Sequence, residues 1–522
     1  MLPPSRPARQ RVTRRHILGS LAVAGGAAIL PGRIVRAADE PPTTFETVRA
    51  LARARAREPY KAPNRDLPRT IARLTYDQHR DIRFRRDRAL QPGDGTFRVE
   101  LFHQGFLFNE AVAVNIARPD GIRTVEYDPA MFDFGANAFA QTDLEGLGFA
   151  GLRLHYPLHR PDYWDELAVF LGASYFRVLG RNQQYGLSAR ALAIDTAAPT
   201  GEEFPSFRAF WIVEPPLGAD RITLFALLDG PSLAGAYRFE IVPGTATTVD
   251  VEAMLVPRRT IGKLGLAPLT SMFLNGENQR RIADDFRPEV HDSDGLWMHR
   301  GNGEWLWRPL TNPRQLRVSA YLDANPRGFG LMQRDRSFAS FQDPEAVYER
   351  RPSYWIEPQG DWGEGWVELV EIPTDEEVHD NIVAYWVSRT PAGAGDEIAI
   401  GWRLSATGSG AALQRAGRVE ATRVGRSGVH GTPAGTGGGG RRYVIDFNGD
   451  ELAELPATLP VEAVVTASAG TISNVTTMKL SATGGWRVFF DFETDAPTAD
   501  LRCFLRLAGH GLTETWTYPW AR

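Results

Sequence analysis

The sequence predicts an all-β protein with a large N-terminal β-sandwich and a smaller, immunoglobulin-like C-terminal β-sandwich. Three observations favour this fold class. Gly and Pro are frequent, with 51 and 36 in 522 residues, as in chains with many turns. Apolar and polar residues alternate in many short runs, which is typical of half-buried strands. A glycine-rich break at residues 406–440 divides these runs into two groups.

The expected elements follow in order along the chain. One amphipathic helix is predicted over residues 45–58. Before the break, strand patterns occupy residues 97–102, 122–127, 221–227, 237–242, 248–255, 366–372 and 397–402. After it, six short strands are predicted over residues 443–447, 461–467, 476–482, 486–492, 499–508 and 513–518. About six strands in a segment of this size are typical of an immunoglobulin-like sandwich, so we predict domains over residues 38–405 and 406–522.

Residues 1–37 have the three regions of a twin-arginine signal peptide, in order. They hold seven Arg and no acidic residue, including the motif Thr13-Arg14-Arg15-His16-Ile17-Leu18. The apolar run over residues 18–30 is shorter than the roughly 20 residues that a membrane-spanning helix needs. Small residues at 35 and 37 then suit cleavage by a signal peptidase. We therefore predict export of the folded protein to the periplasm by the twin-arginine pathway.

Charge excludes several classes of partner. The whole chain has a net charge of −4; removing seven Arg from the 59 basic residues leaves 52 against 63 acidic residues, a net charge of −11. An acidic protein is poorly suited to nucleic acid or to anionic lipid. The single cysteine, Cys503, excludes an intrachain disulfide and a multi-cysteine metal site. We expect Cys503 to be a small buried hydrophobic residue.

The familiar catalytic motifs are absent. None of the nine His outside the signal forms an HExxH or HxH pair, and Pro157 between His155 and His159 disfavours the helix that their spacing needs. No GxSxG motif occurs. The GxGxxG match at residues 435–440 is followed by two Arg and a strand, so it is interpreted as a flexible loop. The sequence therefore predicts no metal and no cofactor.

Tryptophan and acidic residues gather in one region. Eight of the thirteen Trp lie within residues 297–402. They fit either the core of a sandwich or a cleft in which sugar rings stack on indoles. Hydrolysis of a glycoside needs two carboxyl groups, and composition alone does not choose among the acids of this region: Asp292, Asp294, Glu304, Asp361, Glu368, Glu371 and Asp380.

Long sequence blocks in this region are specific to one family. They include LAPLTSMF at 266–273, RPEVHDSDGL at 287–296, GNGEWLWRPL at 301–310, NPRGFGL at 325–331, VELVEIPT at 367–374 and DNIVAYW at 380–386. The chain resembles the osmoregulated periplasmic glucan biosynthesis proteins G and D over essentially its whole length after the signal. The twin-arginine signal favours the D type, because G-type members usually carry an ordinary secretory signal.

The resemblance implies a galactose-mutarotase-like N-terminal sandwich and a role in making the β-1,2-glucan backbone of periplasmic glucans. It implies an endo-β-1,2-glucanase that inverts the anomeric centre. Matched residue by residue, the catalytic carboxyls fall on Asp380, taken as general acid, and Asp292, taken as general base. Tyr348 is the expected proton relay between a carboxyl and water.

Six further residues are expected to bind the glucan. Trp305, Trp307, Trp355 and Trp362 are candidate stacking platforms, and Arg308 and Glu304 are candidate ligands for sugar hydroxyls. The expected partner is β-1,2-glucan, with the inner-membrane glucan synthase and a second copy of the chain as further candidates. Two alternatives stay open: a non-catalytic protein that holds glucan for the synthase, and a glucan transferase.

Overall fold

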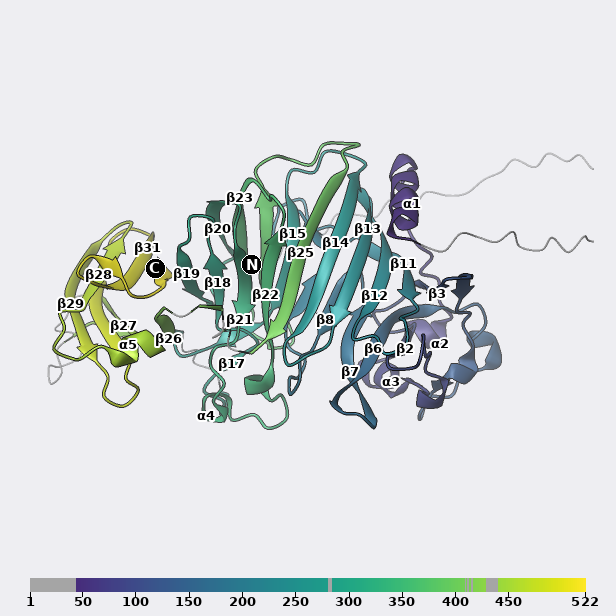
Figure 1. Cartoon of the computed structure of the whole chain (residues 1–522), viewed down its shortest axis with the longest axis horizontal. Helices are drawn as coiled ribbons and strands as arrows, with labels where there is room; N and C mark the ends of the chain where they lie inside the picture. Colours follow the sequence, from purple (N-terminus) through teal and green to yellow (C-terminus); the bar gives the residue numbers. More distant parts are fainter. Residues whose placement is uncertain (1–43, 280–283, 409, 411–412, 415, 429–439) are drawn as a thin grey trace, which may run out of the picture. The chain divides into compact units, whose positions relative to one another are not determined.

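The computed structural model describes residues 44–522 apart from 280–283, 409, 411–412, 415 and 429–439. The predicted signal peptide and most of the GxGxxG match at residues 435–440 lie outside the described residues. Within the described residues the regular structure is nearly all strand, which confirms the predicted all-β class (Figure 1). No described helix is long and apolar enough to cross a membrane.

Two large sheets pack face to face through the main core. Their apolar side chains meet where, for example, the rings of Phe170 and Phe239 lie 5.2 Å apart. The first sheet has ten described strands, ordered as β2 (Arg98–His103), β6 (Phe149–Arg160), β7 (Tyr163–Leu171), β8 (Tyr175–Val178), β9 (Ser188–Arg190), β15 (Leu264–Ser271), β24 (Ile382–Ser388), β23 (Glu364–Glu371) and β20 (Arg317–Ala324), with β10 (Leu192–Ile194) also paired to β15.

The second sheet has fifteen described strands and includes the last strand of the chain. Figure 1 shows its long strands β25, β14 and β13 lying side by side. Its order is β28 (Glu462–Ala467), β31 (Thr498–Leu507), β33 (Thr515–Ala521), β19 (Trp305–Pro309), β18 (Gly295–His299), β21 (Gly328–Met332), β22 (Ser353–Gln359), β25 (Ile398–Thr407), β14 (Thr247–Pro257), β13 (Leu233–Val242), β12 (Ile222–Asp229), β11 (Ser206–Val213), β3 (Ala113–Arg118) and β4 (Gly121–Thr124), with β32 (His510–Gly511) paired to β31.

Smaller elements complete the described structure. A four-stranded sheet consists of β26 (Arg418–Arg426), β27 (Arg441–Asn448), β30 (Trp486–Glu493) and β29 (Thr471–Lys479). Two-stranded sheets pair β1 (Arg83–Phe84) with β5 (Phe132–Asp133), and β16 (Phe273–Asn275) with β17 (Val290–His291). The short helices are α2 (Arg69–Ala72), α3 (Tyr76–Asp81), α4 (Phe338–Phe341), α5 (Asp450–Glu454), η1 (Arg86–Arg88), η2 (Pro129–Met131), η3 (Gln141–Asp143) and η4 (Tyr348–Arg350).

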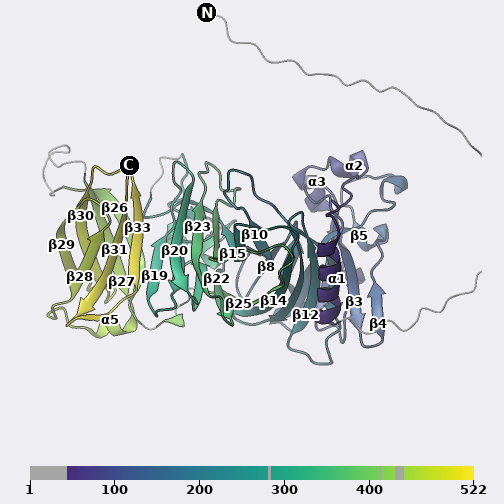
Figure 2. The same cartoon turned by 90° about the horizontal axis from the view of Figure 1, so that it is seen from above.

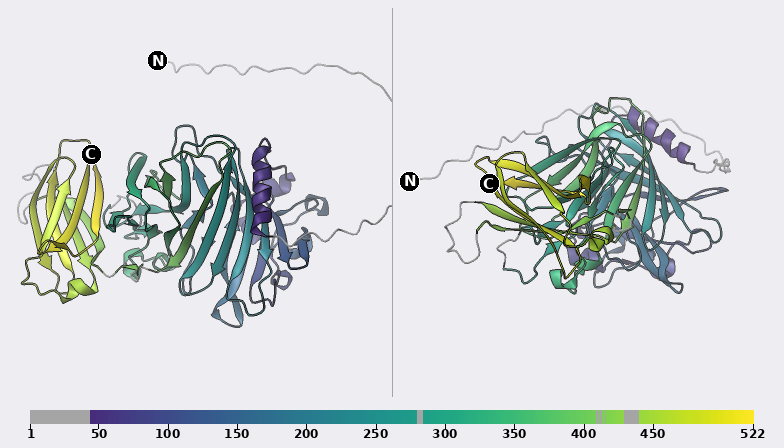
Figure 3. Two further views of the ribbon diagram at one scale, coloured as in Figure 1. Left: turned by 45° about the horizontal axis from the view of Figure 1, so that its top comes forward. Right: turned by 60° about the vertical axis from the view of Figure 1, so that its left-hand side comes forward.

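The one long helix, α1 (Phe45–Arg57), matches the helix predicted over residues 45–58. Thr44 caps it by accepting from the amide of Thr47, and basic residues occupy its last turn, where they suit the negative end of the helix dipole. Its buried face carries Val48 and Ala52. Figures 2 and 3 show α1 lying along the strands of the larger sheet, where the ring of Phe45 stacks on Phe225.

Most strand predictions are confirmed within a few residues, and two of them, over residues 122–127 and 476–482, run past the end of the observed strand. The pattern over residues 122–127 forms a strand only to Thr124 in β4. Four residues later the side chain of Asp128 caps η2 by accepting from the amide of Ala130, so the chain turns away from its neighbour there. Alternating polarity indicates that a segment can form a strand, but it does not indicate where the strand ends.

The strands after residue 417 form a second core with the end of the larger sheet. Tyr443, Phe490 and Trp516 pack there around Cys503, which is buried as expected. Strand β33 pairs in parallel with β19, placing Trp307 beside Trp516. Because this pairing makes one sheet continuous, the described residues form one compact unit, and the domain boundary at residue 406 stays a prediction.

A buried carboxylate joins the two groups of strands. Glu514 is fully buried and accepts from the Arg334 guanidinium at 2.6 Å and from the indole of Trp297 at 2.7 Å. The amide of Val419, on β26, donates to the same carboxylate at 2.7 Å. The Arg334 guanidinium lies 3.6 Å from the ring centroid of Trp307. The ion pair of Glu514 and Arg334 is therefore in contact with β18 through Trp297, with β26 through Val419 and with β19 through Trp307.

Replacing Glu514 by Leu leaves the Arg334 charge buried without its partner. We expect the free energy of unfolding to fall by about 3–5 kcal/mol, the usual cost of breaking a buried ion pair. Urea unfolding followed by tryptophan fluorescence measures this change. The matched control, Glu514→Leu with Arg334→Met, removes both charges and should recover much of the loss. Equal losses in the single and double variants would show that the ion pair itself is not the source.

Candidate active site

The two predicted catalytic carboxyls come together through a shared neighbour, Phe273 on β16. Phe273 pairs with His291 on β17, and Asp292 follows directly. The amide of Phe273 donates to the side-chain carbonyl of Asn381 at 2.8 Å, and the side-chain amide of Asn381 donates back to Phe273 at 3.0 Å. Asp380 immediately precedes Asn381. His291 and Asn381 are therefore both partners of Phe273. Asp292 is the sequence neighbour of the first, and Asp380 is the sequence neighbour of the second.

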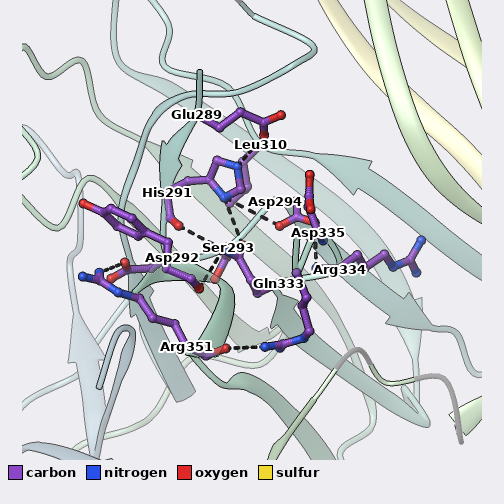
Figure 4. Close-up of polar contacts among 12 residues, drawn as sticks. Glu289, His291, Asp292, Ser293, Asp294, Leu310, Gln333, Arg334, Asp335 and Arg351 are labelled. Atoms are coloured by element: carbon purple, nitrogen blue, oxygen red, sulfur yellow. Dashed lines mark hydrogen bonds and ion pairs between the residues drawn. The ribbon is translucent and has the colours of Figure 1, made fainter. Parts of the chain in front are cut away.

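Asp292 is buried, with 4 % of its surface exposed, and forms an ion pair with Arg351. Its backbone amide donates to the carbonyl of Met272 at 2.8 Å. Burial raises the pKa of Asp292, the Arg351 guanidinium opposes that rise, and the negative charge of Asp380 adds to it. The last effect places the charge of Asp380 close enough to act on Asp292. Figure 4 shows Asp292 beside Arg351.

Asp380, by contrast, is exposed in the segment that leads into β24. Its charge also contributes to raising the pKa of Tyr175, a half-buried residue on β8, after burial and other charges. The pair therefore combines one buried acid with one exposed acid. Such different surroundings are how two carboxyl groups acquire different roles in glycosidases.

Tyr348 lies on η4 with only 2 % of its surface exposed. Its hydroxyl donates to Glu377 at 3.0 Å, and the Arg351 guanidinium lies 4.0 Å from its ring centroid. Burial raises the pKa of Tyr348, and the charges of Glu377 and Asp292 add to that rise while Arg351 opposes it. Tyr348 is therefore near Asp292, but its hydroxyl is bonded to Glu377 in this structure.

Backbone strain precedes Tyr348 directly. Val347 has φ 49° and ψ 50°, in the left-handed region that a β-branched residue rarely adopts. Its amide donates to the carbonyl of Asp343 at 3.1 Å. Such a conformation costs on the order of 1–3 kcal/mol and persists only where the surrounding structure imposes it. The strain sets the direction in which Tyr348 leaves the backbone.

The segment of residues 373–380 is held by a backbone hydrogen bond between the residues that flank it and by an ion pair in its middle. The amide of Ile372 donates to the carbonyl of Asn381 at 2.8 Å. In the middle of the segment, Glu377 pairs with Arg287 at 2.7 Å. On another side, this segment borders an open cleft of about 800 Å³ lined by Leu274, Gln279, Asn312, Pro313, Arg314, Pro373, Thr374, Asp375, Glu376 and His379. The segment that carries Asp380 is therefore held in place and adjoins a polar cleft.

The predicted stacking tryptophans do not line this site. Trp307 and Trp355 are buried in the second core, and Trp362 is buried in the main core. Gly295 and Gly328 make room for the rings of Trp307 and Trp355, since a side chain at either position would overlap them. Trp305 is half-buried and stacks on His299, with ring centroids 4.0 Å apart.

Arg308 and Glu304, the predicted hydroxyl ligands, are also engaged elsewhere. Arg308 has 1 % of its surface exposed and pairs with the fully buried Glu371 at 2.7 Å. Glu304 accepts from Arg300 at 2.9 Å and from the hydroxyl of Thr515 at 3.0 Å. None of the six predicted binding residues has a contact with Asp292, Asp380 or Tyr348 within the described residues. Trp307, Trp355, Trp362 and Arg308 are buried in this structure, and a role for any of the six residues in binding glucan stays a prediction.

Sequence reasoning missed the charged residues that surround the acids. Arg351, Glu377 and Arg287 form the ion pairs just described, and His291 with Gln333 lies behind Asp292. The one sequence signal for Arg351 and His291 was that each lies close to a predicted catalytic residue, Arg351 after Tyr348 and His291 directly before Asp292. No group of three or more His, Cys, Asp or Glu side chains in the described part of the chain is arranged to hold a metal ion.

Comparisons with known proteins identify the family. The family model "Periplasmic glucan biosynthesis protein, MdoG" matches residues 44–520. Glucans biosynthesis protein G of Ralstonia nicotianae is 49 % identical over 484 residues, 90 % of this chain and 94 % of that protein. Proteins of the same name from Vibrio cholerae and Rhodopseudomonas palustris are 48 % and 45 % identical, over 91 % and 98 % of this chain and 86 % and 100 % of theirs. These relatives are named G, so they do not support the predicted D type. The chain belongs to the family of periplasmic glucan biosynthesis proteins.

Proposed function

We propose that this protein controls the β-1,2-glucan backbone of periplasmic glucans by hydrolysing it as an inverting endo-β-1,2-glucanase. The observation that carries the proposal is the pairing of Asp292 and Asp380 across Phe273, with the charge of one raising the pKa of the other. Two carboxyl groups with different surroundings are what glycoside hydrolysis requires. The family supports a role in glucan biosynthesis.

In the proposed mechanism Asp380 is the general acid. It donates its proton to the glycosidic oxygen as the bond from that oxygen to the anomeric carbon breaks. Asp292 accepts a proton from a water molecule whose oxygen forms the new bond on the opposite face of the sugar, which inverts the anomeric centre. Inverting enzymes place their carboxyls roughly 6.5–9.5 Å apart to admit this water.

Arg351 and Tyr348 support these roles. The base must be ionised; burial raises the pKa of Asp292, and the Arg351 guanidinium opposes that rise. A tyrosine hydroxyl both donates and accepts, so Tyr348 can pass a proton between water and Asp292 once its hydroxyl leaves Glu377. Hydrolysis leaves one chain with a new reducing end and another with a new hydroxyl.

Two alternatives use the same residues differently. A scaffold protein that only holds glucan for the membrane synthase needs an open polar cleft, and the cleft beside residues 373–380 would serve it. It has no use for a buried acid coupled to a second acid. A transferase would share the acid pair and pass the sugar to another chain instead of water.

Incubation of the purified protein without its signal with linear β-1,2-glucan tests the enzyme directly. We expect shorter chains with inverted anomeric configuration, seen by chromatography and by NMR of the first products. Asp292→Asn and Asp380→Asn should each lower the rate at least 10²-fold, the scale of a lost general acid or base. Asp361→Asn is the matched control, because Asp361 is an exposed acid in a turn away from the site.

Three outcomes separate the alternatives. Intact glucan that is still bound would contradict the enzyme and support the scaffold. Chains longer than the starting material would support transfer. Full activity in either acid variant would remove that residue from the mechanism.

Replacement of Arg351 by Met decides which acid is the base. Removing the guanidinium raises the pKa of Asp292 further, by about 1–3 units for the loss of an adjacent opposite charge. A base works only when ionised, so the acidic limb of the kcat/KM profile should move to higher pH while the alkaline limb stays. Arg350→Met is the control, since Arg350 is the exposed neighbour. Movement of the alkaline limb instead would exchange the roles of the two acids.

We also propose export by the twin-arginine pathway, on the motif at residues 13–18. Changing Arg14 and Arg15 to Lys should abolish periplasmic protein in fractionated cells, because the pathway reads the arginine pair. Changing Arg9 and Arg11 to Lys is the control and should leave export unaltered. Export of the Arg14→Lys, Arg15→Lys variant would contradict the twin-arginine pathway and favour an ordinary secretory signal.

A further inference from the structure

A histidine lies directly behind the proposed base. His291 ends β17 with 1 % of its surface exposed and immediately precedes Asp292. Its Nε2 is 2.8 Å from the Glu289 carboxylate, and its Nδ1 is 2.9 Å from the side-chain oxygen of Gln333. Figure 4 shows the imidazole between these groups, with Asp294 close by.

The orientation of Gln333 shows that both ring nitrogens of His291 donate. The Gln333 amide nitrogen donates to the carbonyls of His291, at 3.1 Å, and of Tyr348, at 3.4 Å. Those carbonyls cannot donate, so the amide oxygen must be the atom that faces Nδ1. With a carboxylate at Nε2 as well, each nitrogen of the ring meets an acceptor. Only an imidazolium satisfies both contacts.

The charges around the ring favour the same state. Burial lowers the pKa of His291, but its hydrogen bond to the Glu289 carboxylate and the charges of Asp294 and Glu289 raise it to about 9. Asp294 Oδ1 lies 3.7 Å from Nδ1 and has no hydrogen-bond partner among the described residues. The pKa of Asp294 is raised to about 6 by burial, against the charge of His291.

Other titratable groups near this ring belong to four segments. Burial raises the pKa of Glu277, which follows β16, to about 8. Glu277 and Asp335 border the same small cavity as His291 and Asp294. The charged or titratable groups on the surrounding elements are Glu289, Asp292 and Asp294 beside β17, Glu277 after β16, Arg334, Asp335 and Arg336 after β21, Tyr348 on η4 and Arg351 directly after η4.

Aromatic contacts link the ring to Tyr348. The imidazole stacks on Phe273 with centroids 5.4 Å apart and an interplanar angle of 17°. Its edge meets Phe341 at 5.0 Å, and Phe341 in turn stacks on Tyr348 at 5.7 Å. His291 thus joins the strand that carries Asp292 to the turn that carries Tyr348, through Gln333 on one side and Phe341 on the other.

We propose that His291, held as an imidazolium by Glu289 and Gln333, is a positioning residue that keeps Asp292 and Tyr348 in their working arrangement. This proposal rests on the proposed hydrolase function. A neutral imidazole has one donor only, so on losing its proton it would present a lone pair to Glu289 or to Gln333. Gln333 would then lose the orientation in which it holds the Tyr348 carbonyl. Turnover would fall, while glucan binding at exposed groups would remain.

Glu289→Gln tests the proposal without removing the ring. A neutral amide can donate to Nε2 and no longer holds the second proton, so the pKa of His291 should fall by about 1–3 units. The proposed acid must also keep its proton, so the alkaline limb of kcat should move to lower pH to the extent that His291 now loses its proton before that acid does, with KM changed less than about twofold. Glu364→Gln is the control, because Glu364 is exposed and pairs with Arg389 away from the site. Glu289→Asp should restore the wild-type limb in part.

Two readouts do not depend on catalysis. NMR of the His291 ring nitrogens should show titration near pH 9 in the wild type, and lower in Glu289→Gln. Because the pKa of His291 is raised above its usual value of about 6.5, its contribution to stability is complete below that pH and is lost as pH rises through about 9. Urea unfolding across this range should show that loss, and Glu289→Gln should shift it to lower pH.

The outcomes separate this proposal from the proposed function. An active enzyme whose alkaline limb stays in place in Glu289→Gln, while NMR shows a lowered His291 pKa, overturns the positioning role alone. Titration of wild-type His291 near its usual value overturns the imidazolium. A wild-type protein that leaves β-1,2-glucan intact, although His291 titrates near pH 9, overturns the proposed function instead.

Discussion

The side-chain amide of Asn381 bonds to both backbone groups of Phe273, and its backbone closes the segment before it at Ile372. These contacts join positions more than 100 residues apart in the sequence. Phe273 pairs on its other side with His291. Asp292 follows His291 and Asp380 precedes Asn381, so the two acids are brought near each other by these contacts. A short buried strand and one amide therefore set the geometry on which the acid pair depends.

Behind this pair, a chain of buried polar contacts reaches the last strand of the protein. Glu514, directly before β33, holds the guanidinium of Arg334, whose backbone amide donates to Asp294 at 2.7 Å. Asp294 lies beside His291. Polar groups this deep are stable only when each has a partner. The candidate site and the C-terminal strands thus share one network of polar contacts, which runs from Glu514 through Arg334 and Asp294 to His291.

The sequence predicted the fold class and those elements that have a clear local pattern, because alternation and amphipathic spacing are properties of neighbouring residues. Alternating polarity located β13 and β14, and an amphipathic run located α1. The tryptophans show the limit of this reasoning. An indole suits a core and a sugar cleft equally well, and only the glycines that face Trp307 and Trp355 across the sheet reveal which applies. The burial of Arg308 could not be predicted for a related reason, since its partner Glu371 is 63 residues away in the sequence.

By itself the sequence determined the all-β class, the excess of acidic over basic residues, the single cysteine and, through its resemblance to a family, the acids to consider. Tertiary structure decided which groups act on those acids. The pKa of a carboxyl depends on burial and on charges within a few ångströms, and these come from residues far apart in the chain: Arg351 beside Asp292, Glu377 beside Tyr348, and Glu289 with Gln333 around His291. Local sequence carries no record of such neighbours, because they meet only when the sheets close on one another.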